Sequence, residues 1–305
     1  MKFIDLFAGI GGFHSGLSQA GHKCVGWVEY DKYARQSYQA MYETEGLYSG
    51  KDIREVTADE LPYADIWTFG SPCQDISLAG KRSDLSGQKS SLFFEVIRLL
   101  HEKDGGAQKP SWLLMENVRN LLSSNGGFDF ARVLVEMDAV GYDVEWNVFN
   151  TAEFAPQNRE RVYLVGHLRG QHTKQVFPIN PESKQVSESA VKIKQLGSLS
   201  KSNYKQTNRV YDIEGLAPTL NTMQGGGRIP LIVVTDESGQ KQVRKLTPLE
   251  CWRLQGFSDE QFNKAKATGM SDSQLYKQAG NAVSVPIVKL IGEHLEFEAE
   301  KKAEV

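Results

Sequence analysis

The order of apolar and polar positions predicts short buried strands that alternate with helices. Residues 2–7 and 24–29 are apolar runs with β-branched or aromatic side chains, separated by a glycine-rich turn and a helical stretch. The alternation continues with helical patterns at 31–42, 91–102 and 129–141 and strand-like runs at 65–70, 111–117, 142–150 and 161–168. Such alternation predicts an α/β fold in which helices cover both faces of a parallel sheet.

The pattern changes in the stretch 170–243, which is richer in Ser, Lys, Gln, Asn and Gly. Helical periodicity returns at 247–257 and 281–300. We therefore expect two units. A first domain is formed by 1–169 together with 244–305, and a second, smaller domain is formed by the intervening residues.

Composition narrows the setting of the protein. With 305 residues and 40% hydrophobic content, the chain can bury a substantial core. The first residues lack the apolar stretch of a signal peptide, and no apolar run has the length of a membrane span, so we expect a cytoplasmic protein without membrane contact. Cys24, Cys73 and Cys251 are odd in number and form no CxxC pattern, which argues against a disulfide framework and predicts no cysteine-based metal site.

Charge is unevenly distributed, although the net charge is only −3. Residues 157–245 carry a net charge of +7, whereas 1–156 carry −8 and 246–305 carry −2. A basic middle segment fits a solvated surface or the electrostatic footprint of a nucleic-acid site, and charge alone leaves both open.

The first candidate binding motif is DLFAGIGG at 5–12, where the first strand ends and a helix begins. Glycines there let a ligand approach the backbone, although an ordinary tight turn explains a lone glycine cluster equally well. Glu29 ends the second strand, and Asp52 stands at the expected end of a further strand before 65–70. Ligands of open α/β sheets bind at such carboxyl ends. Acidic side chains repel phosphate but accept bonds from ribose hydroxyls and an adenine amine, which favours an adenosyl ligand. Either acid alone could equally be a helix cap or a surface charge.

Cys73 is a candidate nucleophile in the stretch GSPCQDIS at 70–77. Most free cysteines are small buried hydrophobic residues, and this interpretation fits Cys24 and Cys251, which lie inside apolar periodic segments. Cys73 instead follows a strand end and precedes the polar, glycine-containing stretch 74–89, which is typical of a mobile lid. An exposed cysteine near cationic side chains can act as a thiolate nucleophile.

Glu116 ends the strand 111–117 and delivers a carboxyl group to the same edge of the sheet as Cys73. A carboxyl group held against apolar walls can donate a proton near neutral pH, and a helix-capping Glu-Asn pair is the alternative. Arg159 and Arg161 begin a further strand, where surface pairing with Glu160 or other acids is the alternative.

Together these motifs resemble a known family. DLFAGIGG, GSPCQ, ENV, QNRERVYLVG, RKLTPLECWRLQGF and QAGNAVSVPIV closely resemble, in order and spacing, the cytosine-5 DNA methyltransferases. The resemblance covers the chain except about 170–243. It implies a Rossmann-like methyltransferase sheet, a smaller target-recognition domain, and methyl transfer from S-adenosylmethionine to carbon 5 of cytosine in a specific duplex DNA sequence.

By similarity, Phe7 stacks near the adenine of S-adenosylmethionine, Glu29 binds the ribose hydroxyls, and Asp52 with Ile53 holds the adenine. The complete set of cofactor-binding residues that the resemblance implies is Phe7, Ala8, Gly9, Gly11, Gly12, Glu29, Tyr30, Asp52, Ile53, Pro72, Asn281, Ala282 and Val283.

The resemblance also implies catalytic roles. Cys73 attacks carbon 6 of the cytosine, so that carbon 5 can accept the methyl group. Glu116 protonates or hydrogen-bonds ring nitrogen 3 and the exocyclic amine, Arg161 holds oxygen 2, and Arg159 supports the same pocket.

The target carbon is inaccessible in a stacked duplex, so the base must be flipped out. The stretch 74–89 then forms a lid, and TMQGGGR at 222–228 is a candidate base-reading loop. We expect a monomer, because one reading module stands beside one pocket. The predicted DNA contacts are Gln74, Ser77, Lys81, Arg82, Lys89, Gln224 and Arg228.

Alternatives from other classes remain. An RNA methyltransferase of the same chemistry shares these motifs, although the basic variable module and the lack of a recognisable RNA-specific insert favour DNA. A catalytically idle DNA-binding regulator would not need the Cys73 thiol. A small-molecule methyltransferase would need neither a large basic module nor a long polar lid.

Overall fold

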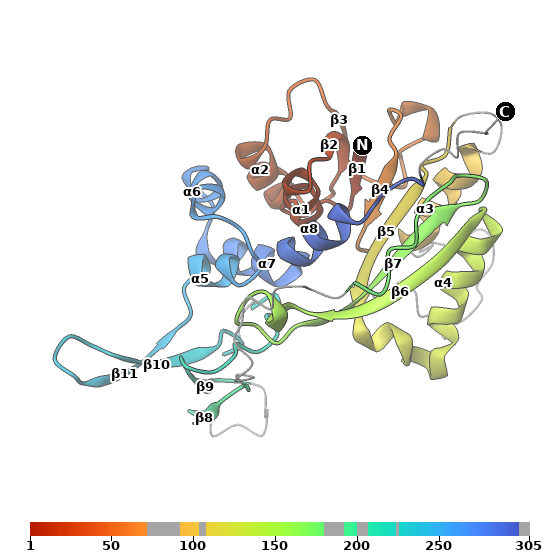
Figure 1. The fold of residues 1–305 in the computed structure, drawn as a ribbon. Helices are drawn as coiled ribbons and strands as arrows, with labels where there is room; N and C mark the ends of the chain where they lie inside the picture. Colours follow the sequence, from red (N-terminus) through yellow and green to blue (C-terminus); the bar gives the residue numbers. More distant parts are fainter. Residues whose placement is uncertain (72–91, 104–107, 180–191, 200–206, 224–225, 299–305) are drawn as a thin grey trace, which may run out of the picture.

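The computed structural model describes residues 1–71, 92–103, 108–179, 192–199, 207–223 and 226–298. Within these residues, the central sheet has the strand order β3–β2–β1–β4–β5–β7–β6 (Figure 1). The strands are β1 (Lys2–Leu6), β2 (Lys23–Val28), β3 (Tyr48–Gly50), β4 (Ile66–Phe69), β5 (Trp112–Val118), β6 (Tyr142–Asn150) and β7 (Glu160–Leu168). The order reverses at β1, because the chain moves outwards to β2 and β3 and then crosses back to β4. Open α/β sheets bind ligands at such a reversal.

Strand direction departs from the prediction at β7. Neighbouring strands from β1 to β5 are parallel, as predicted, but β7 is antiparallel to both β5 and β6. The predicted α/β class is confirmed, but the sheet that was predicted to be parallel is mixed. The short segment between β6 and β7 holds only the 3-10 turn Thr151–Glu153, whereas a parallel return needs a crossover of about a dozen residues or more. Because β7 runs the other way, its first residues lie at the edge where β5 ends.

Helices cover both faces of this sheet (Figure 1). They are α1 (Gly12–Gln19), α2 (Lys32–Met41), α3 (Leu92–Glu102), α4 (Phe128–Ala139) and α8 (Val285–Glu293). On one face, Phe3 of β1 packs with Phe13 of α1 and Ile287 of α8. On the other face, the next residue, Ile4, belongs to the apolar cluster that contains Phe93 of α3. A strand buried on both faces has an almost continuous apolar sequence, which is why the run 2–7 predicted it.

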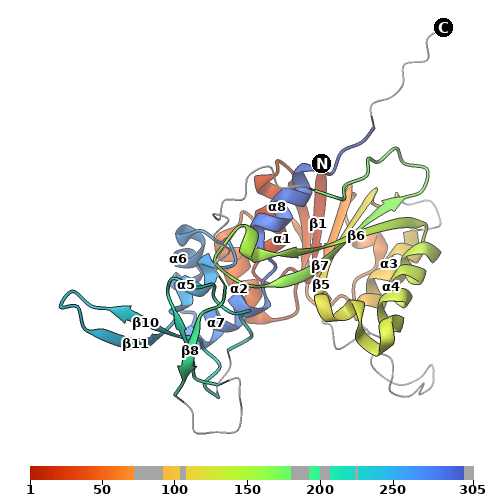
Figure 2. The same ribbon diagram turned by 60° about the horizontal axis from the view of Figure 1, so that its bottom comes forward.

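A second sheet in the described residues has the order β11–β10–β9–β8 and lies beside α5, α6 and α7 (Figures 1 and 2). Its strands are β8 (Gln195–Ser198), β9 (Arg209–Asp212), β10 (Leu231–Thr235) and β11 (Lys241–Lys245), and the helices are α5 (Pro248–Arg253), α6 (Asp259–Ala267) and α7 (Asp272–Asn281). Tyr211 and Ile232 of this sheet share an apolar cluster with Trp252 of α5. This smaller sheet was not predicted from the sequence, which indicated only a second, smaller domain, and the bounds of that domain stay a prediction.

The predicted helix over 281–300 is shorter in the structure. Helix α7 ends at Asn281, Ala282 has an extended backbone with φ −67° and ψ 148°, and α8 begins at Val285. Pro286 lies in the first turn of α8. Backbone N–H groups of a first turn have no acceptor within the helix, so a proline there loses no helical hydrogen bond. The break leaves residues 280–282 at the wall of the cavity described below.

Candidate active site

A cavity of about 540 Å³ opens at the edge where β1, β2, β4 and β5 end and β7 begins. Ligand cavities in proteins commonly measure about 300–1,000 Å³. The cavity is lined by Phe7, Gly9, Ile10, Glu29, Tyr30, Asp31, Ala34, Gly70, Ser71, Leu92, Glu116, Asn117, Val118, Arg159, Arg161, Lys277, Gln278, Gly280, Asn281 and Ala282. The fold thus brings together predicted cofactor residues that follow β1 and β2, residues of the C-terminal break, and the three predicted catalytic side chains that the structure describes.

Glu29 is anchored to the glycine loop at this edge. Its carboxylate accepts hydrogen bonds from Gly9 N at 2.7 Å and from Asp31 N at 2.6 Å, one on each oxygen. Burial raises the pKa of Glu29, and the backbone N–H bonds oppose this rise because they stabilise the charged form. The carboxylate is held in one orientation at the cavity wall.

Gly12 brings the first turn of α1 against the C-terminal break. A Cβ at Gly12 would lie 2.6 Å from the carbonyl oxygen of Val283, so only glycine allows this approach. The cavity lining does not include Ala8, Gly11, Gly12 and Val283. These residues belong to the glycine loop and to the C-terminal break, and neighbouring residues of both segments do line the cavity. Their predicted contact with a cofactor stays a prediction.

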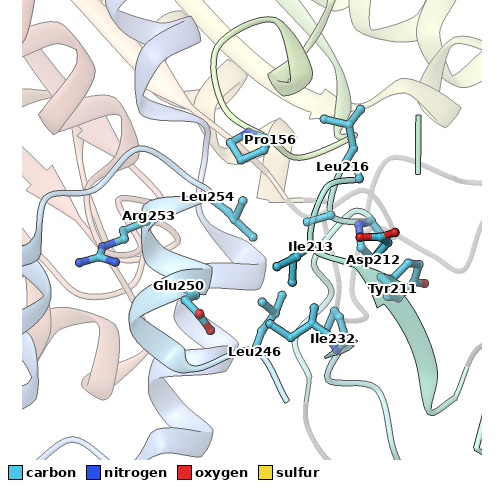
Figure 3. A pocket seen from close by; sticks show the side chains of 14 residues that line it. Pro156, Tyr211, Asp212, Ile213, Leu216, Ile232, Leu246, Glu250, Arg253 and Leu254 are labelled. Atoms are coloured by element: carbon cyan, nitrogen blue, oxygen red, sulfur yellow. The ribbon is translucent and has the colours of Figure 1, made fainter. Parts of the chain in front are cut away.

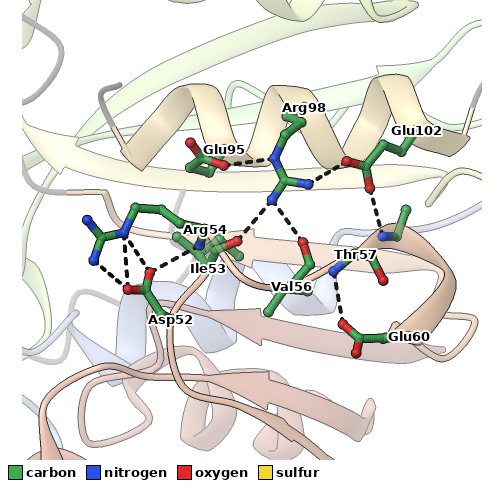
Figure 4. Close-up of polar contacts among 10 residues, drawn as sticks. Asp52, Ile53, Arg54, Val56, Thr57, Glu60, Glu95, Arg98 and Glu102 are labelled. Carbon is green, nitrogen blue, oxygen red and sulfur yellow. Dashed lines mark hydrogen bonds and ion pairs between the residues drawn. The ribbon is translucent and has the colours of Figure 1, made fainter. Parts of the chain in front are cut away.

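Asp52 and Ile53 also lie outside the cavity lining. The Asp52 carboxylate pairs with the guanidinium of Arg54, which lowers the pKa of Asp52 (Figure 4). Ile53 is buried, and its carbonyl oxygen accepts a bond from Arg98 of α3 at 3.1 Å. Arg98 also donates to the Val56 carbonyl at 2.8 Å. Helix α3 therefore holds this loop in place.

Arg98 is a residue that the sequence reasoning missed. It pairs on its own helix with Glu95 at 2.8 Å and with Glu102 (Figure 4). The i, i+3 and i, i+4 spacing of these three charges was visible in the sequence, but such spacing is ordinary on exposed helix faces. The contact with the 53–56 loop is not local and could not be inferred.

Glu116 of β5 and Arg161 of β7 form an ion pair with 3.0 Å between Oε1 and Nε. Their side chains are only 11% and 13% exposed. In the antiparallel register Glu116 lies opposite Tyr163 and Arg161 lies opposite Val118, so the pair is diagonal on one face of the sheet. The predicted acid and the predicted arginine are therefore in contact.

Asn117 connects the end of β5 to the residues that precede Cys73. Its Nδ2 donates to the carbonyl oxygen of Ser71 at 3.1 Å, and its Oδ1 accepts from Val118 N at 2.8 Å. Asn117 is 3% exposed, and its bond to Ser71 is buried. In the sequence, this asparagine stands out only as part of the ENV motif.

Arg159 is buried, at 3% exposure, immediately before β7. Its guanidinium donates to the carbonyl oxygens of Leu220 at 3.3 Å, Gly280 at 3.3 Å and Ala282 at 2.8 Å. Burial, followed by the nearby charge of Arg161, lowers the pKa of Arg159 to about 10. The side chain remains cationic at neutral pH and binds backbone from two segments.

Lys277 of α7 is a further lining residue that the sequence analysis did not identify. Its Nζ lies 2.6 Å from Oδ2 of Asp31, which also caps α2. A basic side chain is therefore held at the rim next to Glu29. Its motif, YKQAG, gave no sign of this pairing because Asp31 is distant in sequence.

Asp5 and His14 form a buried polar layer next to the glycine loop. Asp5 is fully buried; desolvation raises its pKa to about 8, while a 3.2 Å hydrogen bond from Thr68 acts in the opposite direction. Burial lowers the pKa of His14 to about 4, and its Nδ1 lies 2.6 Å from the hydroxyl of Tyr38. Neither residue lines the cavity, and both are predominantly neutral at pH 7.

Several predicted residues lie outside the described part of the chain. They are Pro72, Cys73, Gln74, Ser77, Lys81, Arg82, Lys89 and Gln224. Arg228 is described and lines a small pocket of about 100 Å³ together with Arg209, Thr219 and Asn221. Cys24 and Cys251 are buried, as their apolar surroundings predicted, and burial raises the pKa of each to about 12.

A second cavity, of about 300 Å³, lies between the small sheet and α5 (Figure 3). Leu246, Leu254, Ile213 and Ile232 point into it, whereas Arg253 points away. The lining also includes Tyr211, Asp212 and Glu250, and Glu250 is paired with Arg244 at 2.7 Å.

The described residues contain neither a metal-site arrangement nor a membrane-crossing helix. No group of three or more His, Cys, Asp or Glu side chains there has the arrangement of a metal site. None of the helices described is both long and apolar enough to cross a membrane.

The mixed sheet, the cavity at its strand-order reversal and the separate small sheet define an α/β protein of the Rossmann-like class. The profile of the C-5 cytosine-specific DNA methylase family matches residues 1–229 and 191–296. The chain belongs to this family, which confirms the resemblance stated from the motifs.

Individual relatives agree with this assignment. The type II methyltransferase M.NlaX of Neisseria lactamica is 33% identical over 313 residues and covers 96% of each chain. The type II methyltransferase M.Bsp6I of Bacillus sp. strain RFL6 is 31% identical over 325 residues, covering 97% of this chain and 98% of its own. The solved Dnmt2 methyltransferase of S. pombe has a TM-score of 0.71 at 18% identity, covering 95% of this chain and 97% of that one, which confirms the fold.

Proposed function

We propose that this protein transfers a methyl group from S-adenosylmethionine to carbon 5 of a cytosine in a specific duplex DNA sequence. The observation that carries the proposal is the Glu116–Arg161 pair at the wall of a cavity whose other wall holds the anchored Glu29 carboxylate. The same edge receives the chain that leads through Ser71 to Cys73. Glu29 and Glu116 thus lie at one edge of the sheet, and the described chain reaches that edge at Ser71, two residues before the candidate nucleophile Cys73.

The residues present fit S-adenosylmethionine, on which the family depends. Glu29 can accept bonds from ribose hydroxyls, and Phe7 and Tyr30 supply aromatic surface for an adenine. Asp52 would reach the adenine amine only after its contact with Arg54 is shared or broken. When bound, the cofactor supplies an electrophilic methyl group on a sulfonium.

The Cys73 thiolate would form a bond to carbon 6 of the cytosine, which transfers ring electrons towards carbon 5. Glu116 would donate a hydrogen bond or proton at ring nitrogen 3, where negative charge develops, and Arg161 would hold oxygen 2. Carbon 5 then gains the methyl group and loses its proton to a base. Departure of the thiolate breaks the sulfur–carbon bond and restores the ring.

DNA would lie between the cavity and the small sheet. The basic excess of residues 157–245 suits a phosphate backbone, and Arg228 lines a polar pocket on this sheet. The target base must leave the duplex to reach the cavity. We propose that Gln224 and Arg228 contact base edges, that the stretch 74–89 closes over the flipped base, and that one chain acts as a monomer.

The test uses duplex DNA with 5-fluorocytosine at random positions, S-adenosylmethionine, and either the wild-type protein or Cys73→Ala. Fluorine cannot leave carbon 5 as a proton does, so the wild-type protein is expected to remain covalently attached and the variant is not. Sequencing of the trapped DNA gives the target site. Adducts only with an RNA pool would overturn the DNA substrate, and no adduct with either pool would overturn catalysis by Cys73 and favour a binding protein.

A further inference from the structure

Arg159 lies where three separate segments of the chain meet. Residues 280 and 282, whose carbonyl oxygens it binds, line the large cavity. Leu220, whose carbonyl it also binds, precedes Asn221, which lines the small pocket that contains Arg228. One buried side chain therefore contacts both the wall of the cavity and the segment that leads to the predicted base-reading loop.

The backbones on either side of Arg159 are in close contact as well. A Cβ at Gly280 would lie only 2.0 Å from the carbonyl oxygen of Asn221, so the two segments touch without an intervening side chain. Asn158 N donates to the Ala217 carbonyl at 2.9 Å, and the Thr219 hydroxyl donates to the Asn158 carbonyl at 2.6 Å. The 217–223 segment is thus fastened to the residue before Arg159 and to the end of α7.

The chemistry of arginine makes this junction stiff. A guanidinium presents its donors in one rigid plane, so a shift of one bound carbonyl reorients the donors that face the others. The burial of this cation also makes each lost carbonyl contact costly, because water cannot replace it. A lysine has the same charge but presents its donors from a single flexible ammonium.

We propose that Arg159 is a positioning residue that couples cofactor binding in the large cavity to sequence-specific DNA binding by the small sheet. This inference rests on the proposed function. A cofactor that fixes residues 280–282 would also fix Arg159, and through it Leu220 and the residues that follow. Because such coupling is reciprocal, specific DNA would strengthen cofactor binding by the same factor.

The experiment measures the Kd for an unmethylated duplex that contains the target site found by sequencing the trapped DNA. The measurement is made with and without saturating S-adenosylhomocysteine. For the wild-type protein we expect the ratio of the two Kd values to be on the order of tenfold. For Arg159→Lys the ratio should fall towards one. The melting temperature should fall as well, because the lost carbonyl contacts are buried, so the ratio is measured where circular dichroism shows the variant to be folded. Arg169→Lys is the matched control, since Arg169 also donates to two backbone carbonyls, at 3.1 Å and 3.4 Å, but at the far side of the sheet.

A ratio of one in the wild-type protein, or an unchanged ratio in folded Arg159→Lys, overturns the coupling. If Arg159→Lys fails to fold, hydrogen exchange on the wild-type protein decides. S-adenosylhomocysteine alone should then slow exchange of backbone amides in 217–223, and protection confined to the cavity walls overturns the inference. A wild-type protein that methylates DNA without coupling contradicts this inference only, whereas the absence of methylation contradicts the proposed function.

Discussion

Glu116 and Arg161 contact each other diagonally across two antiparallel strands, with 3.0 Å between Oε1 and Nε. The contact exists because β7 begins at the edge where β5 ends. It puts a carboxyl group and a guanidinium side by side at the cavity wall, where a pyrimidine could be bound through its ring nitrogen and its oxygen.

The first prediction concerns the acid of this pair. Glu116→Gln keeps the shape of the side chain but removes the proton that we assign to ring nitrogen 3. We expect the single-turnover methylation rate to fall by about 10²- to 10⁴-fold. Glu160→Gln is the control, because Glu160 lies on the neighbouring strand β7 but pairs with Arg119 at the surface. Equal activity of the two variants would remove Glu116 from the mechanism.

The second prediction concerns the anchored carboxylate. Glu29→Gln loses the charge that accepts bonds from Gly9 N and Asp31 N. The Kd for S-adenosylhomocysteine, measured by calorimetry, should rise by about 10- to 100-fold, which corresponds to one charged hydrogen bond. Burial raises the pKa of Glu29, so this carboxylate takes up a proton at a higher pH than an ordinary glutamate does. As the pH is lowered, the affinity of the wild-type protein for S-adenosylhomocysteine should therefore begin to fall at that higher pH. Glu55→Gln, at an exposed site, is the control, and an unaltered Kd for Glu29→Gln would contradict the assignment.

The third prediction concerns the residue that holds the start of the Cys73 segment. Asn117→Asp loses the donor to the Ser71 carbonyl and places a carboxylate oxygen near it. We expect about a 10- to 100-fold slower methyl transfer, since small displacements of a reacting group have effects of this size. DNA and cofactor affinities should stay the same.

Asn147→Asp on β6 is a close control for this variant. Asn147 accepts a 2.8 Å bond from the next residue's N–H, as Asn117 does, but it makes no contact with Ser71. If both variants lose the same activity, the effect comes from strand geometry and not from Ser71.

The fourth prediction concerns stability and pH. Asp5 has a pKa of about 8 in the folded protein against 3.8 ordinarily, so the folded state binds more protons than the unfolded state between these values. Its presence therefore makes stability fall as pH rises through this window. His14 has a pKa of about 4 in the folded protein against 6.5 ordinarily, so its contribution makes stability rise with pH between these values. Above pH 6.5 it contributes no pH dependence.

Between pH 6.5 and 8, Asp5→Asn should therefore gain stability relative to the wild-type protein. The gain is expected to reach up to about 2 kcal/mol, from about 1.4 kcal/mol per pKa unit. Urea unfolding of both proteins at several pH values measures this gain. The titration of all other groups is common to the two proteins and cancels in the difference between their free energies of unfolding. A constant difference across this range would show that Asp5 is ionised in the folded protein at neutral pH.

The sequence by itself determined where the strands end and which polar side chains stand there. Glu29 and Glu116 follow apolar runs, and parallel strands bring their carboxyl ends to one edge, so their common location was predictable. The ordered motifs also identified the family, because they combine residue types whose chemistry belongs together.

Only the tertiary structure decided how the remaining side chains are used. The reversed direction of β7 brings Arg161 to Glu116, and Arg159 binds carbonyl oxygens from distant segments. Asp52 follows at the end of an expected strand, yet it pairs with Arg54 outside the cavity lining. The physical reason is that local patterns report strand period and burial, whereas strand direction and buried polar contacts depend on residues far away in the chain.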